Sequence, residues 1–136
     1  MPTVVKWKGN QEFAATTASG HEVPFDTDRK HNSAPGPMEM LLAALGTCSM
    51  VDVVEILAKK RQKLSSLEVE ISGERAKEPP AVWVKIDMVY RLAGEVDDKA
   101  VRDSIELSQN KYCSVAATLR KTAEISYRYE IFATKQ

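Results

Sequence analysis

A long expected helix that starts at Pro37 and extends to about Lys63, and is mostly apolar from Met38 to Leu57, constrains the fold more than any other part of the sequence. Pro37 suits the first position of a helix, where its missing N–H leaves nothing unpaired. From Leu41 through Val54 the segment is apolar on nearly every side, whereas a surface helix shows a single apolar stripe. A domain of 136 residues has difficulty covering such a helix completely. The sequence therefore predicts that a second copy of the chain packs on this helix, in an obligate homodimer.

The rest of the chain alternates between short strand patterns and short helix patterns, without internal repeats. The expected strands cover residues 3–7, 12–17, 22–25, 67–73, 82–92 and 124–132, and the expected shorter helices cover 97–107 and 113–121. The first three strands are separated by glycine turns, which favour a meander, and the next two are expected to pair as an antiparallel hairpin. These patterns predict one α+β domain over residues 1–136, with antiparallel sheets around a long central helix that carries a cysteine.

Charge and the character of the N-terminus limit the partners and the compartment. Lys+Arg and Asp+Glu both total 19, and neither sign forms a block, so no nucleic acid or anionic membrane partner is expected. The apolar segment is interrupted by Glu39, Asp52 and Glu55, which makes it a poor transmembrane candidate. The first residues do not resemble a signal peptide. We therefore expect a cytoplasmic protein whose thiols begin reduced.

The two cysteines, Cys48 and Cys113, each lie in an apolar, helix-like segment. Structural disulfides usually come in sets in small secreted domains, so these thiols are interpreted as catalytic, redox-sensing or simply buried. A reactive thiolate needs a nearby cation, metal or helix N-terminus to lower its pKa. Cys113 stands at the start of an expected helix, whereas Cys48 lies well inside one and needs an activating group from elsewhere. Asp52 and Glu55 share the helical face of Cys48 and would raise its pKa if they came close.

The histidines do not extend this pair of thiols to a metal site. His21 and His31 lie in turn-like or loop segments, and their spacing from each other and from the cysteines does not match known zinc motifs. The run from Arg29 to His31 is interpreted as a solvated loop. No metal and no other cofactor is expected.

Two motifs give the chain a resemblance to a known family. The first is Pro37 followed by the small-residue stretch Ala43–Gly46 and by Cys48, eleven residues after the proline. The second is Cys113–Ala116, which has the pattern Cys-x-Val-x and precedes the final strand. With the order of strands and helices, these motifs resemble the OsmC/Ohr family of thiol-dependent hydroperoxide reductases over nearly the whole length. The resemblance implies an intertwined α+β homodimer with two central helices and active sites at the subunit interface.

The resemblance also implies a mechanism and a set of partners. Cys48 would be the peroxidatic thiolate that attacks a peroxide O–O bond and becomes a sulfenic acid. Cys113 would condense with it to a disulfide, which an external dithiol then reduces. The implied substrate is an organic hydroperoxide or a related oxidant. In the family, the departing oxygen is stabilised by an arginine from the N-terminal strands, held by a glutamate directly after the helix-opening proline.

The sequence departs from the family pattern at this activating pair. Met38 follows Pro37 directly, and the carboxylate appears one place later as Glu39, which turns it by about 100° on a helix. No arginine precedes Arg29. Arg29 and Glu39 are therefore the candidate activating or supporting residues. The Pro-Met-Glu-Met stretch at Pro37–Met40 resembles a branch of the family, the YhfA-like proteins.

Two other functions stay open from the residues. One is a non-catalytic dimer that binds a small lipophilic or electrophilic molecule in an apolar interface pocket lined by the cysteines. The other is a purely structural dimer with inert buried thiols. The missing arginine–glutamate pair favours these two, whereas the two retained cysteines favour the peroxidase.

Overall fold

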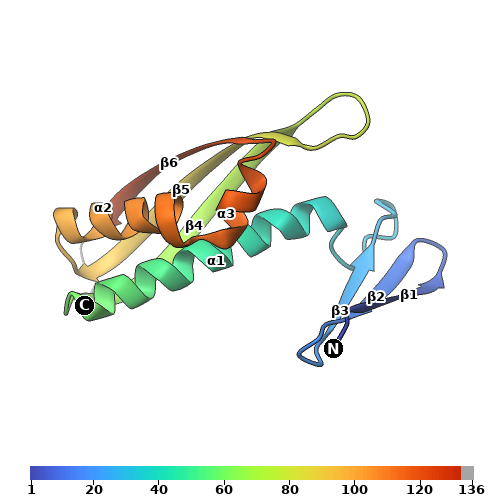
Figure 1. Ribbon diagram of the computed structural model, residues 1–136, viewed down its shortest axis with the longest axis horizontal. Helices are drawn as coiled ribbons and strands as arrows, with labels where there is room; N and C mark the ends of the chain where they lie inside the picture. The colour runs from blue at the N-terminus through green and yellow to red at the C-terminus, as the bar shows by residue number, and fades with distance from the viewer. Residues whose placement is uncertain (133–136) are drawn as a thin grey trace. The chain divides into compact units, whose positions relative to one another are not determined.

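The computed structural model describes residues 1–132 and divides into two compact units, of which the first ends at Ala43. Both are seen in Figure 1. In chain order the elements are β1 (Val4–Gly9), β2 (Glu12–Thr16), β3 (Glu22–Asp26), α1 (Pro37–Lys59), β4 (Lys63–Arg75), β5 (Trp83–Glu95), α2 (Asp98–Leu107), a π-helical turn (Ser108–Tyr112), α3 (Ser114–Leu119) and β6 (Glu124–Phe132). Helix α1 begins in the first unit and continues into the second. That residues 1–136 form one domain stays a prediction.

The first unit is the predicted antiparallel meander, in the order β1-β2-β3. Gly9 and Asn10 make the turn between β1 and β2 with φ angles of 105° and 49°, in the left-handed region that glycine and asparagine tolerate. This sheet encloses little of its own core. Of residues 1–43, all of which the structure describes, only Ala15 and Asp26 are buried.

The second unit contains a three-stranded sheet, in the order β4-β5-β6. Strands β4 and β5 pair antiparallel as a long hairpin, as predicted, whereas β5 and β6 pair parallel. The parallel pair arises because α2, the π-helical turn and α3 form a crossover that returns the chain to the same end of the sheet. The predicted α+β class is confirmed, and this sheet is mixed where only antiparallel pairing was expected.

The helices of the second unit cover one face of this sheet, as Figure 1 shows. Alternate residues of β5 point to this face, and the aliphatic side chains of α1 and α2 complete the core. The buried core residues from these elements are Leu45, Val53, Leu57, Ile86, Met88, Tyr90, Leu92, Ala100, Val101 and Ile105. Gly46 lets α1 lie close to β4, because a Cβ there would stand 2.9 Å from Ile71 Cδ1 and 3.1 Å from Val69 Cγ1. This close packing holds the cysteine-bearing turn of α1 against the sheet.

Two helix boundaries differ from the predictions. Helix α1 ends at Lys59 and not near Lys63, because Arg61 adopts a left-handed φ of 58°. The Gln62 N–H then bonds to the carbonyl of Leu57, and the Arg61 N–H to that of Ala58, which is the Schellman pattern of helix termination. The expected break at residues 108–110 is instead a π-helical turn that follows α2 directly. Ser108 and Gln109 of this turn are buried.

Helix α1 is the one helix among residues 1–132 that is long and apolar enough to cross a membrane by length and composition, despite its acidic residues. Such a match is weak evidence for a membrane span, because the core helix of a soluble protein passes the same test. Leu45, Val53 and Leu57 of α1 are buried within the second unit.

Candidate redox site

The second unit brings the two cysteines together. Cys48 projects from the middle of α1, and Cys113 is the residue that caps the N-terminus of α3. The thiol of Cys113 hydrogen-bonds to the sulfur of Cys48, and the Cys48 Sγ lies 3.8 Å from the hydroxyl oxygen of Ser114. Both cysteines are free thiols, and Cys48 is partly exposed whereas Cys113 is buried. The pair is therefore open to solvent on the Cys48 side only.

The surroundings of Cys48 favour its thiolate. Burial raises the pKa of Cys48, but hydrogen bonds outweigh it and hold that pKa below its usual value. The donors are the backbone N–H of Val115, the thiol of Cys113, and the hydroxyl and backbone N–H of Ser114. The sequence suggested that the N–H groups at the start of this helix would serve Cys113. Two of them, from Ser114 and Val115, serve Cys48, and one serves Cys113, whose sulfur accepts from the Ala116 N–H at 3.4 Å as the cap of the helix.

The surroundings of Cys113 favour its protonated thiol. Burial raises its pKa to about 11, against the Ala116 N–H, which lowers it, and the nearby Cys48 and Asp52 raise it further. Cys113 thus stays a protonated thiol, which allows it to donate to the Cys48 sulfur. The site pairs one thiol that ionises easily with one that does not.

The two carboxylates expected on the Cys48 face have other roles. Asp52 Oδ2 accepts a hydrogen bond from the Ser108 hydroxyl at 2.8 Å, and its charge acts on Cys113. Glu55 is exposed. Asp52 lies on the same helical face as Cys48, but its charge acts on Cys113 because the segment that carries Cys113 packs against this face.

Beneath the cysteines lies a group of buried hydroxyls that the sequence patterns did not reveal. The Ser49 hydroxyl lies 2.5 Å from the Tyr90 hydroxyl and 2.8 Å from the Ser108 hydroxyl. All three side chains are buried, and burial raises the pKa of Tyr90. Ser49 directly follows Cys48, so this group anchors the same turn of α1. Tyr90 stands in an ordinary strand alternation, and nothing in that pattern distinguished it from a core residue.

Gln109 extends this group toward a cation. Its side-chain nitrogen donates to the Tyr90 hydroxyl at 2.6 Å and lies 3.2 Å from the Met88 sulfur. Arg120 donates to the Gln109 side-chain oxygen at 2.9 Å and also to the Gln109 backbone carbonyl. Ser108 and Gln109 are consecutive and both buried, which the wide π-helical turn permits. Because the sequence analysis interpreted residues 108–110 as a break, it did not identify Ser108 and Gln109 as buried residues of the site.

The two candidate supporting residues belong to the first unit. Glu39 accepts a hydrogen bond from the Gly36 N–H at 2.8 Å, so its carboxylate caps the start of α1. Arg29 lies in the loop between β3 and α1, and its side chain is exposed. Their roles toward Cys48 stay predictions.

A second polar cluster, in the first unit, joins Glu12, Asp26 and His31, whose ligand atoms lie within 4.8 Å of one another. These residues also line a cavity of about 430 Å³. The Asp26 carboxylate accepts from the N–H groups of Asp28 and Ser33, the Ser33 hydroxyl and the His31 ring. The Ser33 N–H and the His31 ring hold the pKa of Asp26 well below its usual range, and Asp26 raises the pKa of His31. With both oxygens engaged inside the loop, the cluster fastens the loop that leads into α1.

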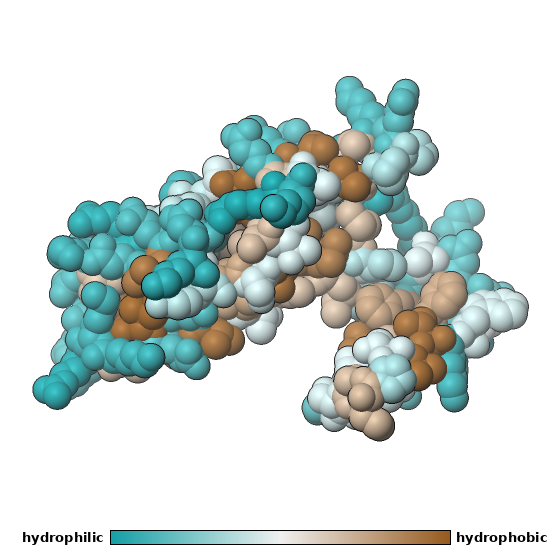
Figure 2. All heavy atoms as spheres, viewed as in Figure 1, coloured by the Kyte–Doolittle hydropathy of each residue, from teal (hydrophilic) through white to brown (hydrophobic). Residues whose placement is uncertain are grey.

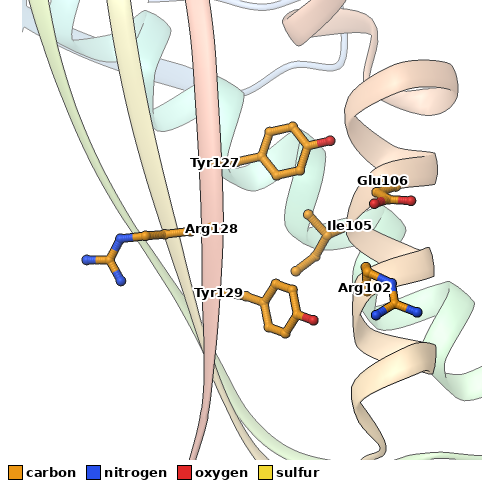
Figure 3. Close-up of a pocket in the computed structure, with 6 residues that line it drawn as sticks. All are labelled: Arg102, Ile105, Glu106, Tyr127, Arg128 and Tyr129. Atoms are coloured by element: carbon orange, nitrogen blue, oxygen red, sulfur yellow. The ribbon is translucent and has the colours of Figure 1, made fainter.

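Another cavity, of about 320 Å³, lies between α2 and β6. Figure 3 shows the rings of Tyr127 and Tyr129 projecting from β6 toward Ile105 of α2, while the Arg128 side chain points away from α2. Neither cavity is lined by Cys48 or Cys113.

Comparison with known proteins agrees with this architecture. The model of the family described as OsmC-like protein matches residues 30–128. Protein YhfA of Escherichia coli K12 is 40% identical over 134 residues, which cover 98% of this chain and 99% of YhfA. The fold resembles that of an OsmC-like protein from Mycoplasma pneumoniae, with a TM-score of 0.82, 16% identity, and coverage of 95% of this chain and 94% of that one.

A more distant structure also has this fold. The Legionella pneumophila organic hydroperoxide resistance protein OsmC, described as a predicted redox protein, has a TM-score of 0.70 and 12% identity to this chain. The match covers 94% of this chain and 96% of that one. The chain matches the family model over residues 30–128, is 40% identical to YhfA and shares the fold of an OsmC-like protein. It therefore belongs to the OsmC-like family.

Proposed function

We propose that this protein is a cytoplasmic, thiol-dependent reductase of organic hydroperoxides, with Cys48 as the peroxidatic residue and Cys113 as the resolving residue. The observation that carries the proposal is the opposite tuning of the two hydrogen-bonded sulfurs. The pKa of Cys48 is lowered, whereas burial raises that of Cys113 to about 11. A peroxidase couple needs this asymmetry, because one sulfur attacks as a thiolate and the other waits as a thiol.

The proposed reaction has three steps. The Cys48 thiolate attacks the terminal peroxide oxygen, so that an S–O bond forms, the O–O bond breaks, and the alkoxide that leaves takes a proton from water. The Cys113 thiol then attacks the sulfenic sulfur, which forms the disulfide and releases water from the sulfenic OH and the Cys113 proton. An external dithiol reduces the disulfide by exchange. Sulfur is oxidised in the first step and restored in the third.

The first step also needs a group that stabilises the developing alkoxide. The N–H groups of Ser114 and Val115 already bond to the attacking sulfur. We propose Arg29 as the cation for the departing oxygen, with Glu39 in support, because the chain has no arginine before position 29. Arginine suits this task through its permanent charge and several donors.

The acting species in this proposal is a homodimer. Val51 and Val54 of α1 are 49% and 47% exposed, and Trp7 of β1 is 69% exposed. Figure 2 shows apolar surface next to α1 and α2 within largely hydrophilic surroundings. A three-stranded sheet with two buried residues is too small to be stable without further packing. A second copy of the chain would cover these surfaces.

Replacing Val51 by glutamate tests the dimer. The native chain is expected to have about twice its monomer mass of 15.1 kDa by light scattering at micromolar concentration, and Val51→Glu is expected to shift it toward the monomer. A charge buried in an apolar interface without a partner opposes association. The control, Lys77→Glu, places a glutamate in the exposed β4–β5 loop and should leave the mass unchanged. A native monomer at these concentrations would contradict the dimer.

The proposed function is tested by mixing the fully reduced protein with one equivalent of an organic hydroperoxide in a stopped-flow instrument. Rapid loss of both thiols and a mapped Cys48–Cys113 disulfide are expected, because the two sulfurs already share a hydrogen bond. The same reaction with hydrogen peroxide measures the preference for organic substrates. Thiols that stay reduced in excess hydroperoxide would exclude the peroxidase and favour a dimer that binds a lipophilic ligand.

A further inference from the structure

The buried polar groups beneath the cysteines form one continuous chain of hydrogen bonds from a cation to a carboxylate. Listed from the positive end, its members are Arg120, Gln109, Tyr90, Ser49, Ser108 and Asp52. The inner four are among the most deeply buried polar side chains of the second unit. Within residues 1–132, no buried side-chain nitrogen or oxygen lacks a hydrogen-bond partner. Every side chain in this hydrogen-bond chain, called below the Arg120–Asp52 chain, therefore has its partners.

The two ends determine the direction of every bond in it. The Ser108 hydroxyl donates to Asp52 Oδ2 at 2.8 Å, nearer than the Ser49 carbonyl oxygen at 3.3 Å, so the Ser108 oxygen accepts from the Ser49 hydroxyl. Ser49 in turn accepts from Tyr90. The Tyr90 oxygen then accepts from the amide nitrogen of Gln109, whose oxygen accepts from Arg120. All dipoles point the same way, and hydrogen bonds aligned in this manner strengthen one another.

The Arg120–Asp52 chain of hydrogen bonds connects the two segments that carry the cysteines. Ser49 and Asp52 belong to α1, and Ser49 is adjacent to Cys48. Ser108 belongs to the π-helical turn, and its carbonyl accepts the backbone N–H of Cys113 at 2.8 Å. Tyr90 projects from β5 and bonds to Ser49 of α1 and to Gln109 of the π-helical turn. A shift of α1 against the turn by an ångström would break several of these bonds at once.

We propose that the Arg120–Asp52 chain is a positioning device, which holds the sulfur of Cys48 against the N–H groups of Ser114 and Val115 and against the thiol of Cys113. This inference rests on the proposed function and assigns to Tyr90 and Gln109 the role of positioning residues. Side chains of similar size without polar atoms would fill the same core at lower desolvation cost. π-Helical turns are frequent at functional sites, where they redirect side chains.

Replacing Tyr90 by phenylalanine removes one hydroxyl from the middle of the chain and keeps the ring. The measurement is the pH profile of Cys48 alkylation by iodoacetamide, with the modified residue identified by mass spectrometry. The midpoint of the profile is expected to rise by about one pH unit, which is about a tenfold slower reaction below the midpoint. The control is Tyr129→Phe, which removes a tyrosine hydroxyl bonded to Asp98 at 2.7 Å on the surface. The control profile should match that of the native protein.

A second variant addresses the unfolding that an isolated buried deletion can cause. In Tyr90→Phe with Gln109→Met, the donor and the acceptor of the Tyr90–Gln109 bond are both replaced by apolar groups, and Arg120 keeps the Gln109 backbone carbonyl as an acceptor, which tends to preserve stability. Its thermal unfolding and its rate of Cys48–Cys113 disulfide formation with diamide are measured beside the alkylation profile. A folded double variant with slower disulfide formation and a raised midpoint supports the proposal. A folded variant with the native midpoint and rate overturns it, as does an equal shift in Tyr129→Phe.

These readouts separate this inference from the peroxidase proposal. Alkylation and oxidation by diamide report the state and spacing of the sulfurs without any hydroperoxide. A protein that fails to react with hydroperoxides but shows the expected shifts would keep the positioning role and lose the proposed substrate. Suppose instead that the protein consumes hydroperoxides equally fast with and without the Tyr90 hydroxyl, and that the alkylation profiles do not shift. The proposed substrate would then stand, and the positioning role would be overturned.

Discussion

Replacing Cys48 by serine is expected to lower the rate of organic hydroperoxide consumption by roughly 10³-fold or more, as loss of a nucleophile does in enzymes. The substitution changes one atom, but a serine hydroxyl does not ionise at neutral pH, so no attacking anion remains. The hydrogen bonds from Val115, Ser114 and Cys113 that favour the Cys48 thiolate have no comparable effect on a neutral hydroxyl. The measurement is steady-state peroxide loss with excess dithiol.

The matched variant is Cys113→Ser, which leaves the attacking sulfur in place. It should consume about one equivalent of hydroperoxide without an intramolecular disulfide, and dimedone should trap the sulfenic acid on Cys48. Both variants keep the volume of the side chain, so their thermal unfolding should stay near that of the native protein. Native rates in Cys48→Ser would rule out Cys48 as the peroxidatic residue.

Cys48 is expected to react with iodoacetamide at pH 8 about 100-fold or more faster than Cys113. The pKa of Cys113 is about 11, and that of Cys48 lies below its usual value of 9.0, so their thiolate populations at pH 8 differ by at least about two powers of ten. The burial of Cys113 adds to the difference. The experiment alkylates the reduced protein for graded times and counts the label at each cysteine by mass spectrometry.

The pH dependence of this reaction has a definite sign. A lowered pKa keeps Cys48 ionised further toward acid, so its rate should begin to fall at a lower pH than that of a free cysteine. The raised pKa of Cys113 moves its reaction toward alkali. In denaturant the two sites should react at similar rates, because both shifts come from the folded surroundings. Equal rates in the native protein would contradict the asymmetry on which the proposed function rests.

Much of the fold was predictable because it depends on local patterns. The period-two alternation predicted β4 and β5, the glycine turn predicted the break after β1, and the apolar run predicted α1, although Val51 and Val54 in that run are about half exposed. Boundaries were predicted less well. Helix α1 ends early because Arg61 adopts a left-handed conformation, and the Ser-Gln-Asn stretch forms a π-helical turn because Ser108 and Gln109 find buried partners. Those partners are distant in sequence, so local propensity did not reveal them.

The sequence by itself determined the α+β class, the family motifs and the two cysteines that carry the proposed chemistry. Only the tertiary structure decided which sulfur receives the N–H groups at the start of α3, where Cys113 uses one as a cap and leaves two for Cys48. It also decided that Asp52 acts on Cys113, and that Arg120 connects to Asp52 through the core. The physical reason is that hydrogen bonds and charges act over a few ångströms in space. The order of residues along α1, the π-helical turn and α3 does not specify those distances; the packing of these elements on one sheet does.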